Sequence, residues 1–439
     1  MSTTLDHPAA ARPTQAFPVE RLRTEFPALQ RPGNGVFFDN AAGAQVPKAV
    51  FDAVNEHMLD RMVQRGGRYA ASMAVDASIA RARASVGALV NARDPHEIAF
   101  GMNATSFIRL VSLAIGQSLG QGADQRNEII ITDLDHEANV ATWLALAPLG
   151  ATFKWWRMRA DANLHLEDLA QLVSPRTRLL ACTVTSNALG TILDVRGAAD
   201  LVHAAGGEVF LDCVHFAPHG AVDVRAFDCD YLVCSGYKIF APHMGFLWGR
   251  YQLLERLPTF REEFIPDAPP GKIEAGTVVY ENVAGMDAAV GYLAQLGRSL
   301  AQGPAVSRTD ASAAPLRTDI ERAMHAILAY ERSLSLEMLK VLRECNAHVH
   351  GIADPAQVAK RVPTLAFNID GVAPAAVTEA MARAGIGIRD GHMYAPRLMQ
   401  RLKLPQESGT VRVSLVHYNT VAEIHRFGNV LFDLIKRQR

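Results

Sequence analysis

Two charged side chains stand directly after apolar segments that are typical of buried strands. Asp212 ends "EVFLD" (208–212), and Lys238 comes 26 positions later, shortly after "YLVCS" (231–235). A free carboxylate or ammonium at such a place is costly unless a partner neutralises it. Taken singly, Asp212 is equally well explained as a helix N-cap or a salt-bridge partner, and Lys238 as a snorkelling surface lysine.

Taken together, these two residues are the pair that pyridoxal phosphate requires, a lysine for a Schiff base and a carboxylate for the pyridinium nitrogen. A phosphate site is then expected. The stretch "GMNATSFIRLVSLAIG" supplies Asn103, Ala104 and Thr105 at the start of an amphipathic helix, where free N–H groups and the helix dipole favour an anion. A plain N-cap explains the same motif. Ser235 and Tyr237, beside the lysine, add two hydroxyls.

Three histidines near the predicted strands have more than one explanation. His136 follows "TDLD" and precedes a helix, where a capping or exposed histidine is common, but its flat ring also suits stacking on a cofactor ring. His215 and His219 have an i, i+4 spacing that metal ligands often show, yet Pro218 interrupts a helix there and no third ligand is evident. No metal site is therefore predicted.

The elements that must position these residues alternate between short β-rich segments and helical stretches from about residue 95 to residue 250. This alternation is typical of a mostly parallel sheet that is covered by helices on both faces. In such sheets, ligands collect at the carboxyl ends of the strands, where the residues above stand. The predicted strands are 128–132, 179–185, 208–212, 231–235 and 245–249, and the helices between them include 137–150 and 195–207.

The C-terminal part predicts a second, smaller sheet. The small and polar segment 303–318 is typical of a linker, and residues 319–345 have helical periodicity. Strands are expected at 364–369 and 411–417, with a helix at 375–385 between them. We therefore predict a large domain of residues 36–302 and a small domain of residues 1–35 and 319–439.

Composition excludes several classes of function. The 439 residues have a net charge of −1, so no basic field exists to recruit nucleic acid or an acidic membrane. The N-terminus lacks a signal peptide pattern, and no run of ~18 apolar residues is present, so we expect a cytoplasmic protein. The five cysteines are scattered and include no CxxC pair, which supports neither a disulfide framework nor a zinc site.

Six motifs occur in an order that is typical of one enzyme family: "DLDHEANVATW", "TSNALGTILDV", "LDCVHFAPH", "SGYKIFAPHMG", "EAGT" and "VRVSLVHYNT". With them, the chain resembles the class V aminotransferase family of fold-type I pyridoxal phosphate enzymes, and within it the cysteine desulfurase-like branch. The resemblance extends from residues 37–47 to residues 413–427. It implies an α/β fold with a mostly parallel seven-stranded sheet between helices in the large domain, plus a smaller α+β domain.

The resemblance assigns roles to residues of the cofactor site. Lys238 resembles the lysine of the Schiff base, Asp212 the partner of the pyridine nitrogen, and His136 the residue stacked on the ring, and these three are the predicted catalytic residues. Asn187 resembles the residue near the phenolic oxygen of the ring. His215 stands where desulfurases usually have a glutamine that also meets this oxygen.

The same resemblance assigns a phosphate cradle and a dimer contact. Ala104, Thr105, Ser235 and Tyr237 correspond to the cradle, although many relatives have histidine in place of the tyrosine. Thr277 in "EAGT" is similar to the threonine that reaches the phosphate of the neighbouring subunit. The resemblance therefore implies a homodimer.

The substrate side contains the main departure from the family. Arg412 resembles the arginine that pairs with the substrate α-carboxylate, and Arg389 is expected nearby. Many desulfurases have a persulfide-forming cysteine where this chain has Tyr394. A phenol cannot accept sulfur as a thiolate does. Cys213 is expected on the opposite face of its strand from its neighbour Asp212.

We therefore predict a pyridoxal phosphate enzyme in which an amino-acid substrate displaces Lys238, which then removes the α-proton. With a sulfur leaving group on the β-carbon, elimination gives a thiol or sulfide, pyruvate and ammonia. This C–S β-lyase reaction needs no cysteine nucleophile and so fits Tyr394.

Other functions stay open at the level of the sequence. They are a cysteine desulfurase or selenocysteine lyase, an amino-acid transaminase or epimerase, and a protein that binds pyridoxal phosphate without turnover. A dinucleotide-dependent oxidoreductase is disfavoured, since Gly33 and Gly35 are followed by Phe38 where a third glycine is needed.

Overall fold

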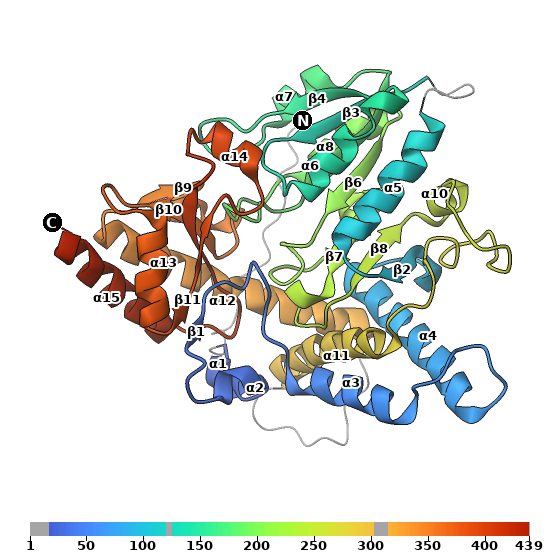
Figure 1. The fold of residues 1–439 in the computed structure, drawn as a ribbon, viewed down its shortest axis with the longest axis horizontal. Helices are drawn as coiled ribbons and strands as arrows, with labels where there is room; N and C mark the ends of the chain where they lie inside the picture. Colours follow the sequence, from blue (N-terminus) through green and yellow to red (C-terminus); the bar gives the residue numbers. More distant parts are fainter. Residues whose placement is uncertain (1–16, 120–124, 303–314, 439) are drawn as a thin grey trace.

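A seven-stranded sheet forms the centre of the larger part of the molecule. The computed structural model describes residues 17–119, 125–302 and 315–438. The strands follow the order β2-β8-β7-β6-β5-β3-β4, in which β8 is antiparallel to both neighbours and the other neighbouring pairs are parallel (Figure 1). They are β2 (Ile98–Gly101), β3 (Glu128–Thr132), β4 (Thr152–Trp156), β5 (Thr177–Thr183), β6 (Glu208–Asp212), β7 (Tyr231–Ser235) and β8 (Gly245–Gly249).

Helices cover both faces of this sheet because its central strands are apolar on both sides. All five residues of β3 are buried, which is typical of a strand between two layers of helices. One face packs against α5 (Ala104–Ser118), α6 (Ala138–Leu144) and α10 (Tyr251–Arg256). The other packs against α4 (Ala70–Val90), α7 (Leu166–Leu172), α8 (Val195–Ala204), α9 (Val224–Phe227) and α11 (Tyr280–Gln302). Single 3-10 turns are η1 (Pro95–Glu97), η2 (Ala147–Leu149) and η3 (Gly236–Lys238).

The fold class predicted from the sequence is confirmed, and several strands agree with it to the residue. The strands at 128–132, 208–212, 231–235 and 245–249 have the predicted bounds. β5 begins and ends two residues earlier than expected, and the predicted helix at 137–150 divides into α6 and η2. The sequence interpretation did not include β2 or β4.

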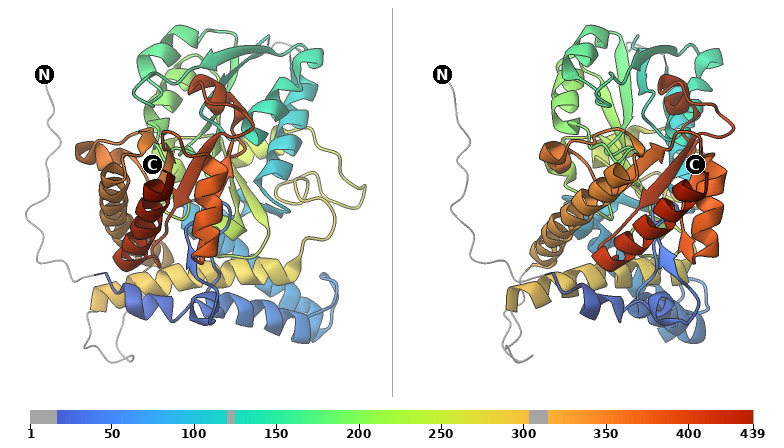
Figure 2. Two further views of the ribbon diagram at one scale, coloured as in Figure 1. Left: turned by 60° about the vertical axis from the view of Figure 1, so that its left-hand side comes forward. Right: turned by 90° about the vertical axis from the view of Figure 1, so that its left-hand side faces the viewer.

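A four-stranded antiparallel sheet lies beside the large one, in the order β12-β13-β10-β9. Its strands are β9 (His348–His350), β10 (Thr364–Asn368), β12 (Arg389–Gly391) and β13 (Thr410–Ser414). The helices of this part are α12 (Leu316–Glu344), α13 (Pro374–Arg383), α14 (Pro396–Arg401) and α15 (Val421–Gln438), with η5 (Pro355–Lys360). Figure 2 shows α12 and α15 side by side.

The N-terminal segments connect the two sheets. β1 (Val36–Phe37) pairs in parallel with β11 (Ile386–Gly387). Before and after it lie α1 (Val19–Arg23), α2 (Pro27–Gln30) and α3 (Lys48–Asp60). Residues 303–314 of the predicted linker lie outside the described residues, and 316–318 are helical rather than loop because α12 begins at Leu316. The division into two domains stays a prediction.

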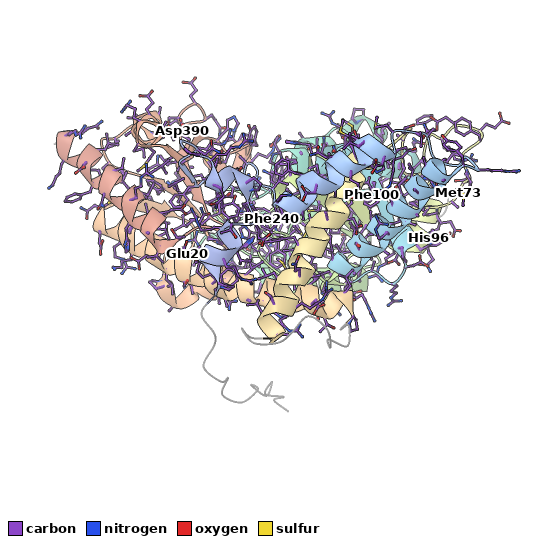
Figure 3. The ribbon with its side chains drawn as sticks, turned by 90° about the horizontal axis from the view of Figure 1, so that it is seen from below. Glu20, Met73, His96, Phe100, Phe240 and Asp390 are labelled. Carbon is purple, nitrogen blue, oxygen red and sulfur yellow. The ribbon has the colours of Figure 1, made fainter. Side chains whose placement is uncertain are left out.

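A buried aromatic cluster fixes the position of the segment that carries Lys238. Phe240, two residues further along, contacts His417 edge to face at 4.7 Å between ring centroids. Phe26 and Tyr292 complete the cluster at 6.3 and 6.4 Å from the Phe240 ring. Figure 3 shows Phe240 between the two halves of the molecule. The lysine is therefore held close to a rigid contact between them.

The long helices are amphipathic. α15 buries Ile424, Phe427, Leu431 and Ile435 at helical spacing, as a helix that packs on a core does. In the parts of the chain that the structure describes, no helix is both long and apolar enough to cross a membrane. The cytoplasmic location expected from the sequence stays a prediction.

Candidate active site

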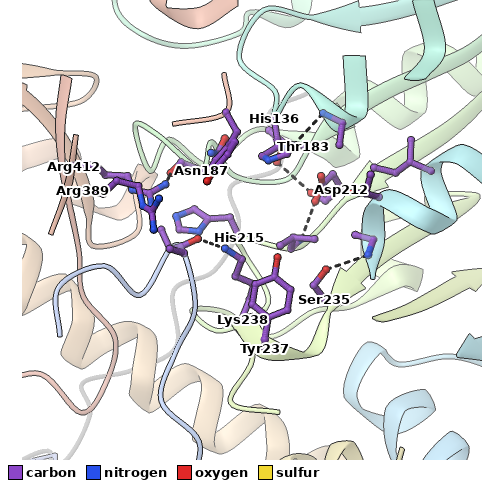
Figure 4. A pocket seen from close by; sticks show the side chains of 18 residues that line it. His136, Thr183, Asn187, Asp212, His215, Ser235, Tyr237, Lys238, Arg389 and Arg412 are labelled. Carbon is purple, nitrogen blue, oxygen red and sulfur yellow. Dashed lines mark hydrogen bonds between the residues drawn. The ribbon is translucent and has the colours of Figure 1, made fainter. Parts of the chain in front are cut away.

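The carboxyl ends of four strands of the large sheet meet at one cavity of about 360 Å³. Twelve of the thirteen predicted site residues line it (Figure 4). They are Ala104, Thr105, His136, Asn187, Asp212, His215, Ser235, Tyr237, Lys238, Arg389, Tyr394 and Arg412. The sequence interpretation of these residues as one cluster therefore agrees with their placement, while their chemical roles stay predictions.

Lys238 is held inside the cavity by the backbone. Its Nζ donates a hydrogen bond to the carbonyl oxygen of Ala41 and lies 5.0 Å from the ring centre of Tyr237. Burial, reinforced by the nearby charge of Arg412, lowers the pKa of Lys238 to about 7. A substantial fraction of this amine is therefore neutral near neutral pH, as a nucleophile or base must be.

Asp212 lies across the cavity from the arginines (Figure 4). Its Oδ1 accepts a hydrogen bond of 3.0 Å from the backbone N–H of Val214. Burial raises the pKa of Asp212 to about 6, against that hydrogen bond and the charge of Lys238. The carboxylate is thus charged above about pH 6 and has capacity for a cationic partner. Cys213 lies in the hydrophobic core and does not line the cavity.

His136 presents a neutral ring to the cavity. Burial, with the charges of Lys238 and Arg412, lowers the pKa of His136 to about 4. Its Nδ1 accepts a hydrogen bond of 3.1 Å from the backbone N–H of Ala138, so the proton resides on Nε2. A neutral, flat ring of this kind can stack on another ring without the cost of burying a charge.

The N-terminus of α5 forms a polar corner of the cavity. The Ala104 N–H donates to Ser235 Oγ at 3.1 Å, and Asn103 caps the helix by accepting from the Ser106 N–H at 2.9 Å. The start of α5 packs closely on β8, since a Cβ at Gly245 of β8 would lie 2.6 Å from the Asn103 Cα. This corner combines the first N–H groups of α5, the helix dipole and a hydroxyl, which together favour a phosphate.

Two arginines of the small sheet form the other end of the cavity. Arg412 Nη1 donates to the Asn187 carbonyl oxygen at 2.9 Å, whereas its Nε is buried and without a hydrogen-bond partner. Arg389 lies on the neighbouring strand, directly opposite Arg412 in the register of β12 and β13. A carboxylate placed here would satisfy the unpaired donor.

The loop that carries Tyr394 has an unusual backbone. Met393 and Tyr394 have φ angles of 53° and 57°, a left-handed conformation that costs energy for residues other than glycine. Asn187 Nδ2 donates to the Met393 carbonyl oxygen at 2.7 Å, and the Glu137 N–H donates to that of Tyr394 at 2.8 Å. The Tyr394 N–H in turn donates to His392 Nδ1 at 3.0 Å. These contacts hold the phenol at the edge of the cavity.

The histidine pair at 215 and 219 lies between the cavity and the core. His215 Nε2 is 2.9 Å from Thr364 Oγ1, and burial, with the charge of His219, lowers the pKa of His215 well below its usual value. His219 Nδ1 pairs with the buried Glu331 at 2.7 Å. In the described ranges, no group of three or more His, Cys, Asp or Glu side chains is arranged to hold a metal ion.

Thr277 is the predicted site residue that lies outside this cavity. It is exposed, and Gln64 Nε2 donates to its Oγ1 at 3.0 Å. Its role in the site of a neighbouring subunit stays a prediction.

Sequence reasoning missed Asp39, which bridges both arginines of the cavity. Its Oδ1 is 2.9 Å from Arg412 Nη2, and its Oδ2 is 2.9 Å from Arg389 Nη2. The sequence pattern that could have identified Asp39 is its position directly after the apolar segment "VFF" and before small residues.

Comparisons with known proteins show what this chain is similar to. The family profile described as Aminotransferase class-V matches residues 36–303 and 311–427. An aminotransferase-like protein, FGM3, from Gibberella zeae is 32% identical over 423 residues, which cover 94% of this chain and 97% of that protein. A cysteine desulfurase from Serratia proteamaculans is 32% identical over 430 residues, again 94% and 97% of the two chains.

A solved structure is similar over almost the whole chain. The crystal structure of the cysteine desulfurase CsdA from Escherichia coli has a TM-score of 0.80 and 27% sequence identity. The superposition covers 96% of this chain and 100% of that one.

Proposed function

Because this chain belongs to the class V aminotransferase family and is a cysteine desulfurase-like, pyridoxal phosphate-dependent enzyme, we propose that it acts as a C–S β-lyase. The substrate is cysteine or a cysteine-derived amino acid. The products are a thiol or sulfide, pyruvate and ammonia.

The residues of the cavity fit pyridoxal phosphate. Asp212 is a buried carboxylate that accepts one backbone hydrogen bond and can pair with a ring nitrogen. The corner formed by α5 and Ser235 can hold the phosphate, and the neutral ring of His136 can stack on the cofactor ring. Asn187 Oδ1 is buried and unpaired, as a group awaiting a ligand is. When bound, pyridoxal phosphate takes up the charge that develops on the substrate α-carbon.

The chain's own residues then have distinct tasks. Arg412 and Arg389 bind the α-carboxylate and fix the orientation of the substrate. The Lys238 amine accepts the α-proton, which its lowered pKa of about 7 allows near neutral pH. The bond between the β-carbon and sulfur breaks, the electron pair leaves with sulfur, and the remaining unsaturated amino acid hydrolyses to pyruvate and ammonia.

The observation that favours a lyase over a desulfurase is the position of the cysteines. All five are buried, and none lines the cavity. Burial raises the pKa of the Cys182 and Cys213 thiols well above the usual value, so a thiolate is disfavoured. A desulfurase must transfer sulfur to a thiolate at the site, whereas a β-lyase releases it. The similarity to cysteine desulfurases keeps that reaction as the alternative.

Product analysis separates the two reactions. Purified holoenzyme is incubated with L-cysteine, cystine and cysteine conjugates, and pyruvate and alanine are quantified. We expect pyruvate in amounts equal to the thiol or sulfide released. Alanine formed together with protein-bound sulfur would refute the lyase proposal.

Tyr394 offers a sharper version of this experiment. Tyr394→Cys places a thiol on the loop at the edge of the cavity, so we expect new alanine and new protein-bound sulfur beside pyruvate. The matched control Tyr394→Phe removes the hydroxyl without adding a thiol and is expected to form pyruvate alone. Equal alanine from both variants would show that the loop does not determine the outcome.

We also propose a homodimer in which Thr277 completes the neighbouring site. Its exposed position supports this, as do the large apolar side chains that the single chain leaves exposed near it in sequence, Phe260 at 96% and Phe264 at 81%. Sedimentation analysis is expected to give twice the chain mass. A monomer that retains full activity would contradict the shared site.

A further inference from the structure

We infer that Asp39 sets the net charge of the substrate end of the cavity and thereby selects amino acids with one carboxylate and an uncharged side chain over dicarboxylic ones. The inference deepens the proposed function, and it rests on it in taking the two arginines as the carboxylate site. It adds a positioning residue that does not itself line the cavity.

The contacts of Asp39 join the two arginines into one unit. Its Oδ1 pairs with Arg412 Nη2 at 2.9 Å. Its Oδ2 accepts from both Nε and Nη2 of Arg389, at 3.0 and 2.9 Å, and so occupies one whole edge of that guanidinium. The backbone keeps Asp39 in place, since it forms an isolated parallel bridge with Ser414, two residues beyond Arg412.

The charges at this end leave one positive unit. The two guanidiniums and the one carboxylate together carry a net charge of +1. The Arg412 side chain is 2% exposed, so solvent screens its charge little, while Asp39 is 24% exposed and Arg389 39%. One substrate carboxylate therefore brings this end of the cavity to neutrality, and a second leaves an uncompensated negative charge in a partly buried place.

Of the neighbouring charged groups, Asp390 also acts on Arg389, but less than Asp39 does. Asp390 follows Arg389 in β12, but its Oδ1 accepts from Thr378 Oγ1 at 2.8 Å, and the residue lies at the outer edge of the small-sheet half (Figure 3). Asp212 lies on the far side of the cavity (Figure 4). Lys238 is engaged by the cofactor in the proposed holoenzyme.

The donors that remain free suit a single carboxylate. Arg412 Nε is buried and unpaired, whereas its two Nη atoms already donate to Asn187 and Asp39. Without Asp39, the whole Nε and Nη2 edge of Arg389 would also be free for a second carboxylate. Asp39 thus closes the position that a dicarboxylic substrate needs.

Two unreactive acids of equal chain length test this inference. Butanoate and butanedioate are titrated into the wild-type holoenzyme and into Asp39→Asn by calorimetry at fixed ionic strength. The wild type is expected to bind butanoate more tightly. In Asp39→Asn, the ratio of the two dissociation constants is expected to shift roughly tenfold in favour of butanedioate, because one negative charge is removed beside the arginines.

The control is Asp39→Glu, which keeps the charge and is expected to keep the wild-type ratio. If Asp39→Asn binds both acids more weakly by the same factor, so that the ratio of dissociation constants is unchanged, Asp39 only orients the arginines and the inference is overturned. So would a wild type that prefers butanedioate. Because neither acid reacts, the result is independent of whether pyruvate or alanine is formed in the test of the lyase proposal.

Discussion

The two sides of the cavity are built from different kinds of structure. On the cofactor side, Asp212 ends β6 and Lys238 follows the adjacent strand β7, and these two strands pair in parallel and are buried between helices. On the substrate side, Arg389 lies on β12, a three-residue edge strand of the small sheet, and Tyr394 lies in a loop with left-handed backbone. The first side is rigid through its sheet, and the second depends on contacts from outside its own sheet.

Those outside contacts come from the cofactor side itself. The loop after β3 supplies the Glu137 N–H, and the loop after β5 supplies the Asn187 amide, each bonded to a carbonyl oxygen of the segment 393–394. The large sheet thus carries the residues proposed for the cofactor and also holds the loop that contains Tyr394. Changes on the two sides are therefore expected to have different signatures.

Lys238→Ala is expected to give the largest effect, a loss of activity of at least roughly 10³-fold, because it removes both the covalent attachment and the base. After borohydride treatment with the cofactor, mass spectrometry should find no cofactor fixed to the variant protein. The matched control is Lys272→Ala, which changes a buried lysine bonded to the Glu255 carbonyl oxygen, outside the cavity. Cofactor still fixed to Lys238→Ala would identify another lysine as the attachment point.

Arg412→Lys is expected to have the next largest effect and to lower kcat/KM roughly 100-fold through KM. A single ammonium cannot reach both Asn187 and Asp39 and also offer the donor that Arg412 Nε leaves free for the carboxylate. Arg389→Lys should cost roughly tenfold, since its side chain is 39% exposed and water screens its charge, against 2% exposed for Arg412. Steady-state kinetics of both variants with one substrate measures the difference. Equal losses would mean that the two arginines share the carboxylate evenly.

The contrast between the two sides also explains what could be predicted from the sequence. β6 and β7 agree with the prediction to the residue because each is an apolar run that ends at a polar side chain. The edge strand β4 was missed because Lys154 interrupts its aromatic residues and its first residue is exposed. Buried strands leave a strong pattern in sequence, and edge strands leave a weak one.

The substrate side could be predicted only in part. Arg412 and Tyr394 were found through the family resemblance. The left-handed backbone at Met393 could not be predicted, because no glycine stands at that position. The bridge from Asp39 to the arginines joins residues 350 and 373 positions apart, and spacing in sequence contains no information on such a contact. Contacts between residues this far apart in sequence can be identified only from the three-dimensional structure.

The pH dependence of cofactor capture tests the environment of Lys238. With its pKa near 7, the Lys238 amine of the cofactor-free protein is an ammonium below that pH and neutral above it. The rate of absorbance change after pyridoxal phosphate is added should therefore rise roughly tenfold from about pH 6 to about pH 8 and then level off. Arg412→Met removes a cation that helps to lower this pKa and should move the midpoint upward. A rate that keeps rising to about pH 10, as for an ordinary lysine, would contradict the assigned environment.

Asn103→Ala is expected to have the smallest effect and to separate folding from cofactor binding. Loss of the cap on α5 should lower the free energy of unfolding by about 1 kcal/mol, measured by urea denaturation. The control Asp194→Ala removes an equivalent cap, from the Gly197 N–H of α8, whose capped end does not line the cavity. Both variants should lose a similar amount of stability. Only Asn103→Ala should also lower the affinity for the cofactor, by roughly fivefold, because only α5 directs its N-terminus at the phosphate corner. Equal cofactor affinity in the two variants would place the phosphate away from α5.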